Sequence, residues 1–132
     1  ETGQSLPGLE FQGRTENSAV WLKTNSVTEI TKGVRIGTFL QNTTMDVQFR
    51  DGREVTLRSI QIQIQVNCTD GNYLELAEAH FTEEFGKGTQ IWASAPNPAT
   101  SGLAPKQYLP MGSMMHLVVN SICTLRLSQK RA

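Results

Sequence analysis

Few residues in this chain have the type and spacing that catalysis or metal binding requires. Glu78 stands two positions before His80, but neither this histidine nor His116 belongs to an H-E-x-x-H motif. The two cysteines form no C-x-x-C pair, which argues against a zinc site, and no G-x-S-x-G elbow marks a serine nucleophile. The sequence therefore predicts no enzyme, no metal and no cofactor, and a small hydrolase or ligand carrier is kept only as an alternative.

The cysteines and two asparagines bear on the cellular compartment. Cys68 and Cys123 form an even count, which suits a disulfide, although two buried free thiols are the alternative. Asn42 and Asn67 each begin an N-x-[ST] glycosylation signal. We therefore expect an extracellular domain, either secreted or part of the ectodomain of a membrane-anchored glycoprotein. Its predicted modifications are a Cys68–Cys123 disulfide and glycans on Asn42 and Asn67.

A proline-rich segment is the first candidate for a surface that binds a protein partner. Residues 94–112 hold four of the five prolines and form a long predicted loop, and loops of that length are usually functional. Aromatic and methionine side chains in and around this loop suit adaptable protein contacts. The predicted contact residues are Trp92, Tyr108, Met111 and Met114.

Four arginines suggest a second, basic surface. Guanidinium groups bind carboxylates and sulfate-like groups in a forked geometry, so such a patch would suit an acidic partner. Protection of a strand edge and pairing with nearby acids is the alternative. The arginines are Arg35, Arg50, Arg53 and Arg58.

Alternating residues predict a hairpin in the middle of the chain. Apolar residues at 45, 47 and 49 resume at 55 and 57 after the Asp51-Gly52 turn signal. Only a three-residue loop, with Gly52 in the left-handed conformation, pairs Val47 with Val55 and leaves both apolar sets on one face. The following run, Ile60–Val66, is apolar at even positions, so we expect a bulge or a bend toward a second sheet at Arg58–Ser59.

The remaining segments complete the predicted architecture. Leu74, Ala77, Phe81 and Phe85 recur at helical spacing, which predicts one short helix at about residues 73–85. Alternation over Met114–Leu127 predicts a long final strand. The fold class is therefore mainly β, a single-domain antiparallel β-sandwich or jelly-roll-like fold with one short helix.

Composition sets limits on the function. The chain has 132 residues, a formal net charge of zero and 38% hydrophobic residues, which suits one folded domain and argues against a nucleic-acid partner. No apolar run is long enough to insert in a membrane. Glu1–Gly3 is interpreted as a vector-derived remnant, and residues 4–132 as a single β-rich extracellular domain.

These observations lead to a functional hypothesis with one main alternative. We predict an extracellular recognition domain that acts through protein–protein contacts, its partner being a cell-surface receptor or another part of the same ectodomain. The alternative is an assembly domain of a larger ectodomain or viral glycoprotein that self-associates through the face carrying Gln61, Gln63 and Gln65, which would make the protein a homo-oligomer.

Overall fold

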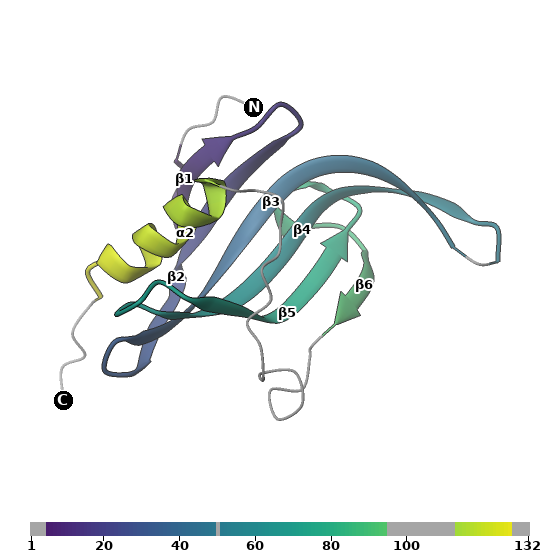
Figure 1. Ribbon diagram of the computed structural model, residues 1–132. Coiled ribbons are helices and arrows are strands. Elements are labelled where there is room, and N and C mark those ends of the chain that lie inside the picture. The colour runs from purple at the N-terminus through teal and green to yellow at the C-terminus, as the bar shows by residue number, and fades with distance from the viewer. Residues whose placement is uncertain (1–4, 50, 95–112, 128–132) are drawn as a thin grey trace.

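The computed structural model describes residues 5–49, 51–94 and 113–127. Its strands form one six-stranded antiparallel sheet in which each strand pairs with the next along the chain, and a helix crosses one face of that sheet (Figure 1). The elements are β1 (Leu9–Arg14), β2 (Ser18–Thr31), β3 (Val34–Gln48), β4 (Glu54–Asn67), β5 (Tyr73–Phe81), the 3-10 turn η1 (Glu84–Gly86), β6 (Gln90–Ser94) and the helix α2 (Ser113–Thr124).

The prediction of a mainly β, antiparallel domain with one short helix is confirmed, but the sandwich or jelly roll is not. The described strands make a single sheet, and α2 supplies the second layer over its apolar face (Figure 1). Isoleucine and glutamine alternate along β4. One face of the sheet is therefore strongly apolar, and a single helix can cover it. Within the described ranges, no helix has the length and apolar character needed to span a membrane.

Two segments have the opposite secondary structure from the one that their sequences suggested. The stretch predicted as a helix over residues 73–85 is strand β5 followed by the turn η1. Pairing of β5 along β4 overrides the helix propensity of its Glu, Ala and Leu residues. The segment predicted as a strand over Met114–Leu127 contains α2 instead. Its buried residues Met114, Val118 and Ile122 recur every four positions, which is the spacing of one helix face.

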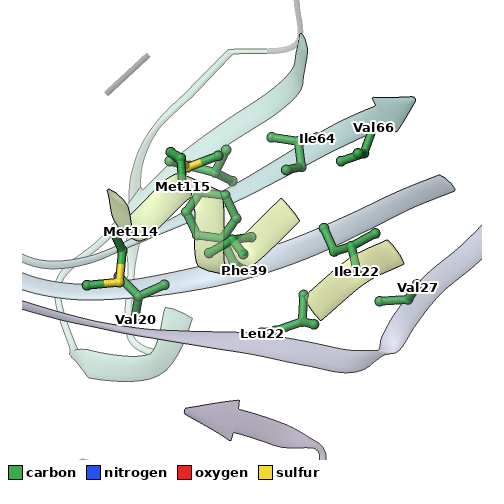
Figure 2. Packing of buried hydrophobic residues seen from close by; sticks show 11 residues of the cluster. Val20, Leu22, Val27, Phe39, Ile64, Val66, Met114, Met115 and Ile122 are labelled. Carbon is green, nitrogen blue, oxygen red and sulfur yellow. The ribbon is translucent and has the colours of Figure 1, made fainter. Parts of the chain in front are cut away.

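The hydrophobic core lies between the sheet and α2 (Figure 2). Gly37 on β3 lets the helix approach closely, because a Cβ atom at this position would lie only 2.9 Å from Ile122 Cδ1. The sheet contributes Val20, Leu22, Val27, Phe39, Ile62, Ile64 and Val66, and the helix contributes Met114, Met115, Val118 and Ile122.

The opposite face of the sheet carries a smaller aromatic cluster. Trp21 is only 1% exposed although α2 lies on the other side of the sheet. Its ring centroid lies 5.4 Å from that of Phe11 on β1 and 4.8 Å from that of Phe85 in η1. The turn that contains η1 therefore folds back over this face and covers part of it.

The β3–β4 hairpin confirms the predicted loop length and register. Val47 pairs with Val55 and Met45 with Leu57, so the apolar sets share one face. Gly52 has a φ of 92°, the left-handed conformation that a three-residue hairpin loop requires.

The expected irregularity near Arg58–Ser59 is a bulge, and it lies on the facing strand. The register shifts between Asn42 and Met45 on β3, where two residues stand opposite Arg58. Strand β4 itself continues without a break and stays in the same sheet.

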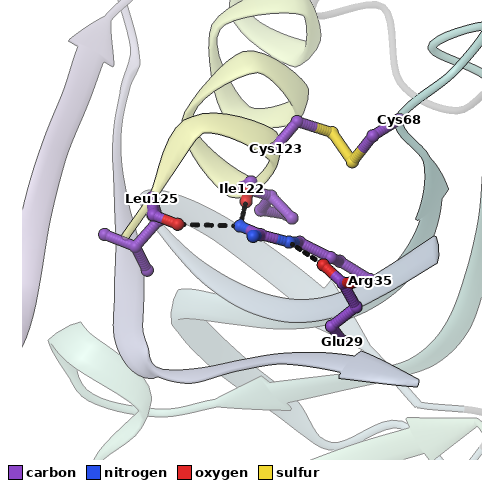
Figure 3. Close-up of polar contacts among 6 residues, drawn as sticks. All are labelled: Glu29, Arg35, Cys68, Ile122, Cys123 and Leu125. Atoms are coloured by element: carbon purple, nitrogen blue, oxygen red, sulfur yellow. Dashed lines mark hydrogen bonds and ion pairs between the residues drawn. A yellow bond between two sulfur atoms is a disulfide. The ribbon is translucent and has the colours of Figure 1, made fainter. Parts of the chain in front are cut away.

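A disulfide joins the end of β4 to the end of α2. The predicted Cys68–Cys123 bond is present, with the two Cα atoms 5.6 Å apart and a sequence separation of 55 (Figure 3). The bond therefore ties the last described helix covalently to the middle of the sheet.

Arg35 fastens the same end of the helix through hydrogen bonds. Its Nη1 donates to the backbone oxygens of Ile122 at 2.7 Å and Leu125 at 2.8 Å, while its Nε lies 3.0 Å from Oε1 of Glu29 (Figure 3). A positive charge at the C-terminus of a helix also interacts favourably with the helix dipole. The C-terminal end of α2 is thus fixed twice.

Candidate functional site

Among the residues predicted to contact a partner, Trp92 is placed on the surface by the structure. It lies on β6 with 46% of its surface exposed. Its ring stacks on that of His80 on β5, with the centroids 4.6 Å apart. His80 Nε2 in turn lies 2.6 Å from Oε2 of Glu78. We call these three residues the Trp92 cluster, in which an exposed indole is held on one side by an oriented imidazole.

The Trp92 cluster lies at the edge of the sheet. β6 is the last strand in the sheet order, and among the described residues only β5 pairs with it. The register pairs Trp92 with His80, and His80 with Ile60. Ile60 packs against the core beneath α2. The cluster therefore lies on the same face as the helix, beyond the part of the sheet that the described helix covers (Figure 1).

The other predicted contact residues do not join Trp92. Met114 is 5% exposed and packs in the core, so its predicted contact role is corrected: its position on the inner face of α2 gives it a packing role. Tyr108 and Met111 lie outside the described residues.

The basic patch is not brought together, and this prediction is also corrected. Arg35 pairs in register with Val66 near one end of β3, whereas Arg53 follows the hairpin loop at the other end. Arg53 bonds to Asp51 at 2.8 Å, the local pairing that was the alternative, and Arg58 is exposed on β4. Arg50 lies outside the described residues. The length of β3 separates Arg35 from Arg53, and Arg35 donates hydrogen bonds to the C-terminal end of α2 instead.

The two glycosylation signals differ in accessibility. Asn42 is 6% exposed, and its Nδ2 atom, which would carry the sugar, is buried. The folded chain therefore leaves no room for a glycan on Asn42. Asn67 is exposed at the end of β4, so glycosylation of Asn67 stays a prediction.

The glutamine face was a further candidate, for self-association. Gln61, Gln63 and Gln65 lie half-buried on the face opposite α2, and self-association through them stays a prediction. The acids of residues 69–86 are dispersed, since Glu75 is buried and Glu78 contacts His80. In the described part of the chain, no group of three or more His, Cys, Asp or Glu side chains is placed to hold a metal.

Sequence reasoning missed a cavity of about 470 Å³ on the face opposite α2. We call it the bulge pocket because it opens at the β3 bulge. Three separate segments form its wall: residues 14–19 at the β1–β2 connection, residues 42–45 on β3, and Glu84 in η1. The Phe85-Gly86-Lys87-Gly88 run was a local signal for a tight turn, but no sequence pattern links it to the other two segments.

Buried polar side chains hold the turn beside this pocket. Ser59 Oγ donates to the backbone oxygen of Glu83 at 2.6 Å and accepts the Gly86 N–H at 2.9 Å. Asn42 Oδ1 accepts the N–H of Phe85 at 2.8 Å. Backbone groups of the turn are therefore satisfied by side chains of β3 and β4, which fixes the turn over the sheet.

Comparison with known families identifies the lineage of the chain. The family model for surface-adhesin protein E matches residues 9–124, which spans every strand and α2. The chain belongs to the surface-adhesin protein E family. A comparison with curated protein sequences finds no match.

Solved structures of Haemophilus influenzae protein E have the same fold as this chain. Crystal form II has 13% sequence identity and a TM-score of 0.64, and the match covers 92% of this chain and 91% of that chain. The selenomethionine form has 13% identity and a TM-score of 0.65, with 93% and 91% covered. The structure from non-typeable Haemophilus influenzae has 13% identity and a TM-score of 0.52, with 93% and 76% covered.

Family membership gives the function in outline. A surface adhesin is a cell-surface binding protein, which confirms the predicted binding role and exposure at the cell surface. It also confirms that the chain is not an enzyme.

Proposed function

We propose that this domain attaches to a host protein outside the cell and that the Trp92 cluster makes the contact. The exposed indole of Trp92 is the observation that carries this proposal. The side chain is 46% exposed, and its ring is already oriented by contact with the His80 ring. Tryptophan is enriched among the residues that dominate binding energy at protein interfaces.

The strand that carries Trp92 suits an extended partner segment. An edge strand presents backbone N–H and C=O groups to which another strand can add. On β6 these groups lie beside an indole and a histidine–glutamate pair, so a bound segment would meet both backbone hydrogen bonds and an aromatic anchor. We infer that the partner contributes an extended polypeptide segment with at least one apolar side chain.

Replacement of Trp92 tests this proposal. We expect Trp92→Ala to weaken binding to a host extracellular protein about 30-fold, because loss of a central aromatic contact typically costs about 2 kcal/mol or more. The measurement is biolayer interferometry of the purified domain against a panel of host matrix and cell-surface proteins, followed by adhesion of coated beads to host cells.

Leu117→Ala is the matched control for this experiment. Leu117 is also 46% exposed, but it lies on the outer face of α2. Its replacement should leave binding unchanged. Equal effects of the two variants, or no effect of Trp92→Ala, would show that the contact lies elsewhere on the domain.

A further inference from the structure

The bulge pocket combines a size suited to a small ligand with a wall that is part polar and part apolar. Its volume of about 470 Å³ falls within the range of about 300–1,000 Å³ that is typical of ligand sites. Six neutral hydroxyl or amide residues line it, together with both signs of charge and two apolar residues. The lining comprises Arg14, Thr15, Glu16, Asn17, Ser18, Ala19, Asn42, Thr43, Thr44, Met45 and Glu84.

Asn42 provides an independent observation at the base of this pocket. The side chain is 6% exposed, and its Oδ1 accepts the N–H of Phe85. Its Nδ2 has no hydrogen-bond partner among the described residues. A buried amide donor without a partner typically costs about 1–3 kcal/mol, so a folded chain retains one rarely. This cost is a second sign that the wall of the pocket is not optimised for stability alone.

The backbone beside Asn42 is strained in a way that supports the same site. Phe85 has φ 61° and ψ 32°, the left-handed conformation that a bulky residue seldom adopts. Its ring is anchored against Trp21, and its N–H is anchored by Asn42. Strain of this kind persists where the surrounding structure fixes it, often at binding sites. Here it places Glu84 at the wall of the pocket.

The lining chemistry selects the class of ligand. Hydroxyl and amide groups both donate and accept hydrogen bonds, and they match a ligand whose own groups do both. Arg14, Glu16 and Glu84 bring both signs of charge, so the wall does not favour a simple anion or cation. Ala19 and Met45 add an apolar strip against which C–H groups can pack. A sugar ring has this combination of hydroxyls and a C–H face.

We propose that the bulge pocket binds one saccharide unit of a host glycan. Sugar hydroxyls meet Thr15, Asn17 and Thr44 at the rim. The sugar C–H face packs on Met45. This site lies on the opposite face of the sheet from the Trp92 cluster, so it goes beyond the protein contact proposed above and does not depend on it.

A glycan array probed with the whole chain tests the proposal. We expect a group of glycans with a shared terminal sugar to bind, and the methyl glycoside of that sugar to compete. In NMR titrations with this glycoside, amide shifts should concentrate at residues 15–17, 43–45 and 84. Competition by the methyl glycoside shows that a single sugar is recognised, whether it is free or part of a glycan.

Paired variants separate binding from folding. Thr15 and Thr44 are exposed, so Thr15→Val with Thr44→Val should leave the melting temperature unchanged and weaken glycoside binding about tenfold or more by removing two hydroxyls. Thr31→Val, at an exposed threonine on β2 away from the pocket, should have no effect. Asn42→Asp keeps Oδ1 and places an acceptor where the buried donor was, which alters the wall of the pocket, and it should weaken glycoside binding. If Asn42→Asp does not fold, the threonine variants decide.

Several results would overturn the saccharide proposal. They are an array on which no glycan binds, glycan binding that the threonine pair does not weaken, and shifts that concentrate at Trp92. Binding of lysine-rich peptides in place of glycans would also refute it. Because Trp92→Ala leaves this pocket intact, the two proposals can fail separately.

Discussion

Removal of the Cys68–Cys123 disulfide should destabilise the domain by an amount that the structure sets. The bond closes a loop between cysteines whose sequence separation is 55. On the chain-entropy model, losing such a crosslink frees conformational entropy in the unfolded chain worth about 4 kcal/mol at 25 °C. For a chain of 132 residues, this loss corresponds to a fall of about 14 °C in the melting temperature.

The test is urea denaturation of Cys68→Ala with Cys123→Ala, compared with the oxidised chain. The sequence holds no other cysteine, so treatment of the unmodified chain with a reductant acts on this bond alone and should give the same loss. The dependence of unfolding free energy on urea should steepen, because an unfolded chain without the crosslink exposes more surface.

The expected result also depends on how α2 is held. Its buried residues and the two bonds from Arg35 should keep the helix docked after the disulfide is lost, so unfolding should remain a single transition. A loss below about 1 kcal/mol would refute the entropic reasoning. Binding of an apolar dye before the transition would refute the docking, since it would report a sheet face from which α2 had separated.

Two further predictions concern packing and ionisation. Gly37→Ala should destabilise the fold by about 1–3 kcal/mol, because the new methyl group would meet Ile122 Cδ1; adding Ile122→Val should restore part of the loss, as measured by thermal unfolding of the single and double variants. Burial raises the pKa of Tyr73 above its ordinary value of 10.0, so the folded chain keeps this proton at a pH where the unfolded chain releases it. Stability should therefore fall as the pH rises above 10, and Tyr73→Phe should flatten that fall in urea denaturation at pH 9 and 10.5.

The hairpin and the disulfide could be predicted from the sequence because each had few geometric solutions. The apolar sets around Val47 and Val55 share one face only with a three-residue loop, and a slip of one residue would turn one set to the other face. With two cysteines, the only intramolecular disulfide is the one observed.

The assignments of β5 and α2 failed because local patterns were ambiguous. In β5, helix-forming residues sit in a strand that β4 and β6 hold from both sides, so the deciding interactions come from elsewhere in the chain. In α2, the apolar residues fit both the alternating pattern of a strand and the four-residue pattern of a helix. The helix is favoured only because Met114, Val118 and Ile122 pack together on the apolar face of the sheet, which local sequence does not reveal.

Local sequence patterns predict the candidate sites even less well than they predict β5 and α2. Nothing in the residue type separates exposed Trp92 from buried Trp21, because exposure depends on which strand forms the edge of the sheet and which side the turn with Phe85 covers. The bulge pocket joins three segments that are distant in the sequence, so no local motif marks it.

The order of strands in the sheet has a consequence for how the chain matures. Because every strand pairs with its predecessor, the sheet can grow as the chain emerges, without waiting for distant partners. Among the described elements, the one that closes the core comes last: α2 brings Cys123 to Cys68, which directly follows β4. Oxidation of this pair therefore requires that α2 has already docked on the sheet, so we expect the disulfide to form late in folding, after the strands have paired.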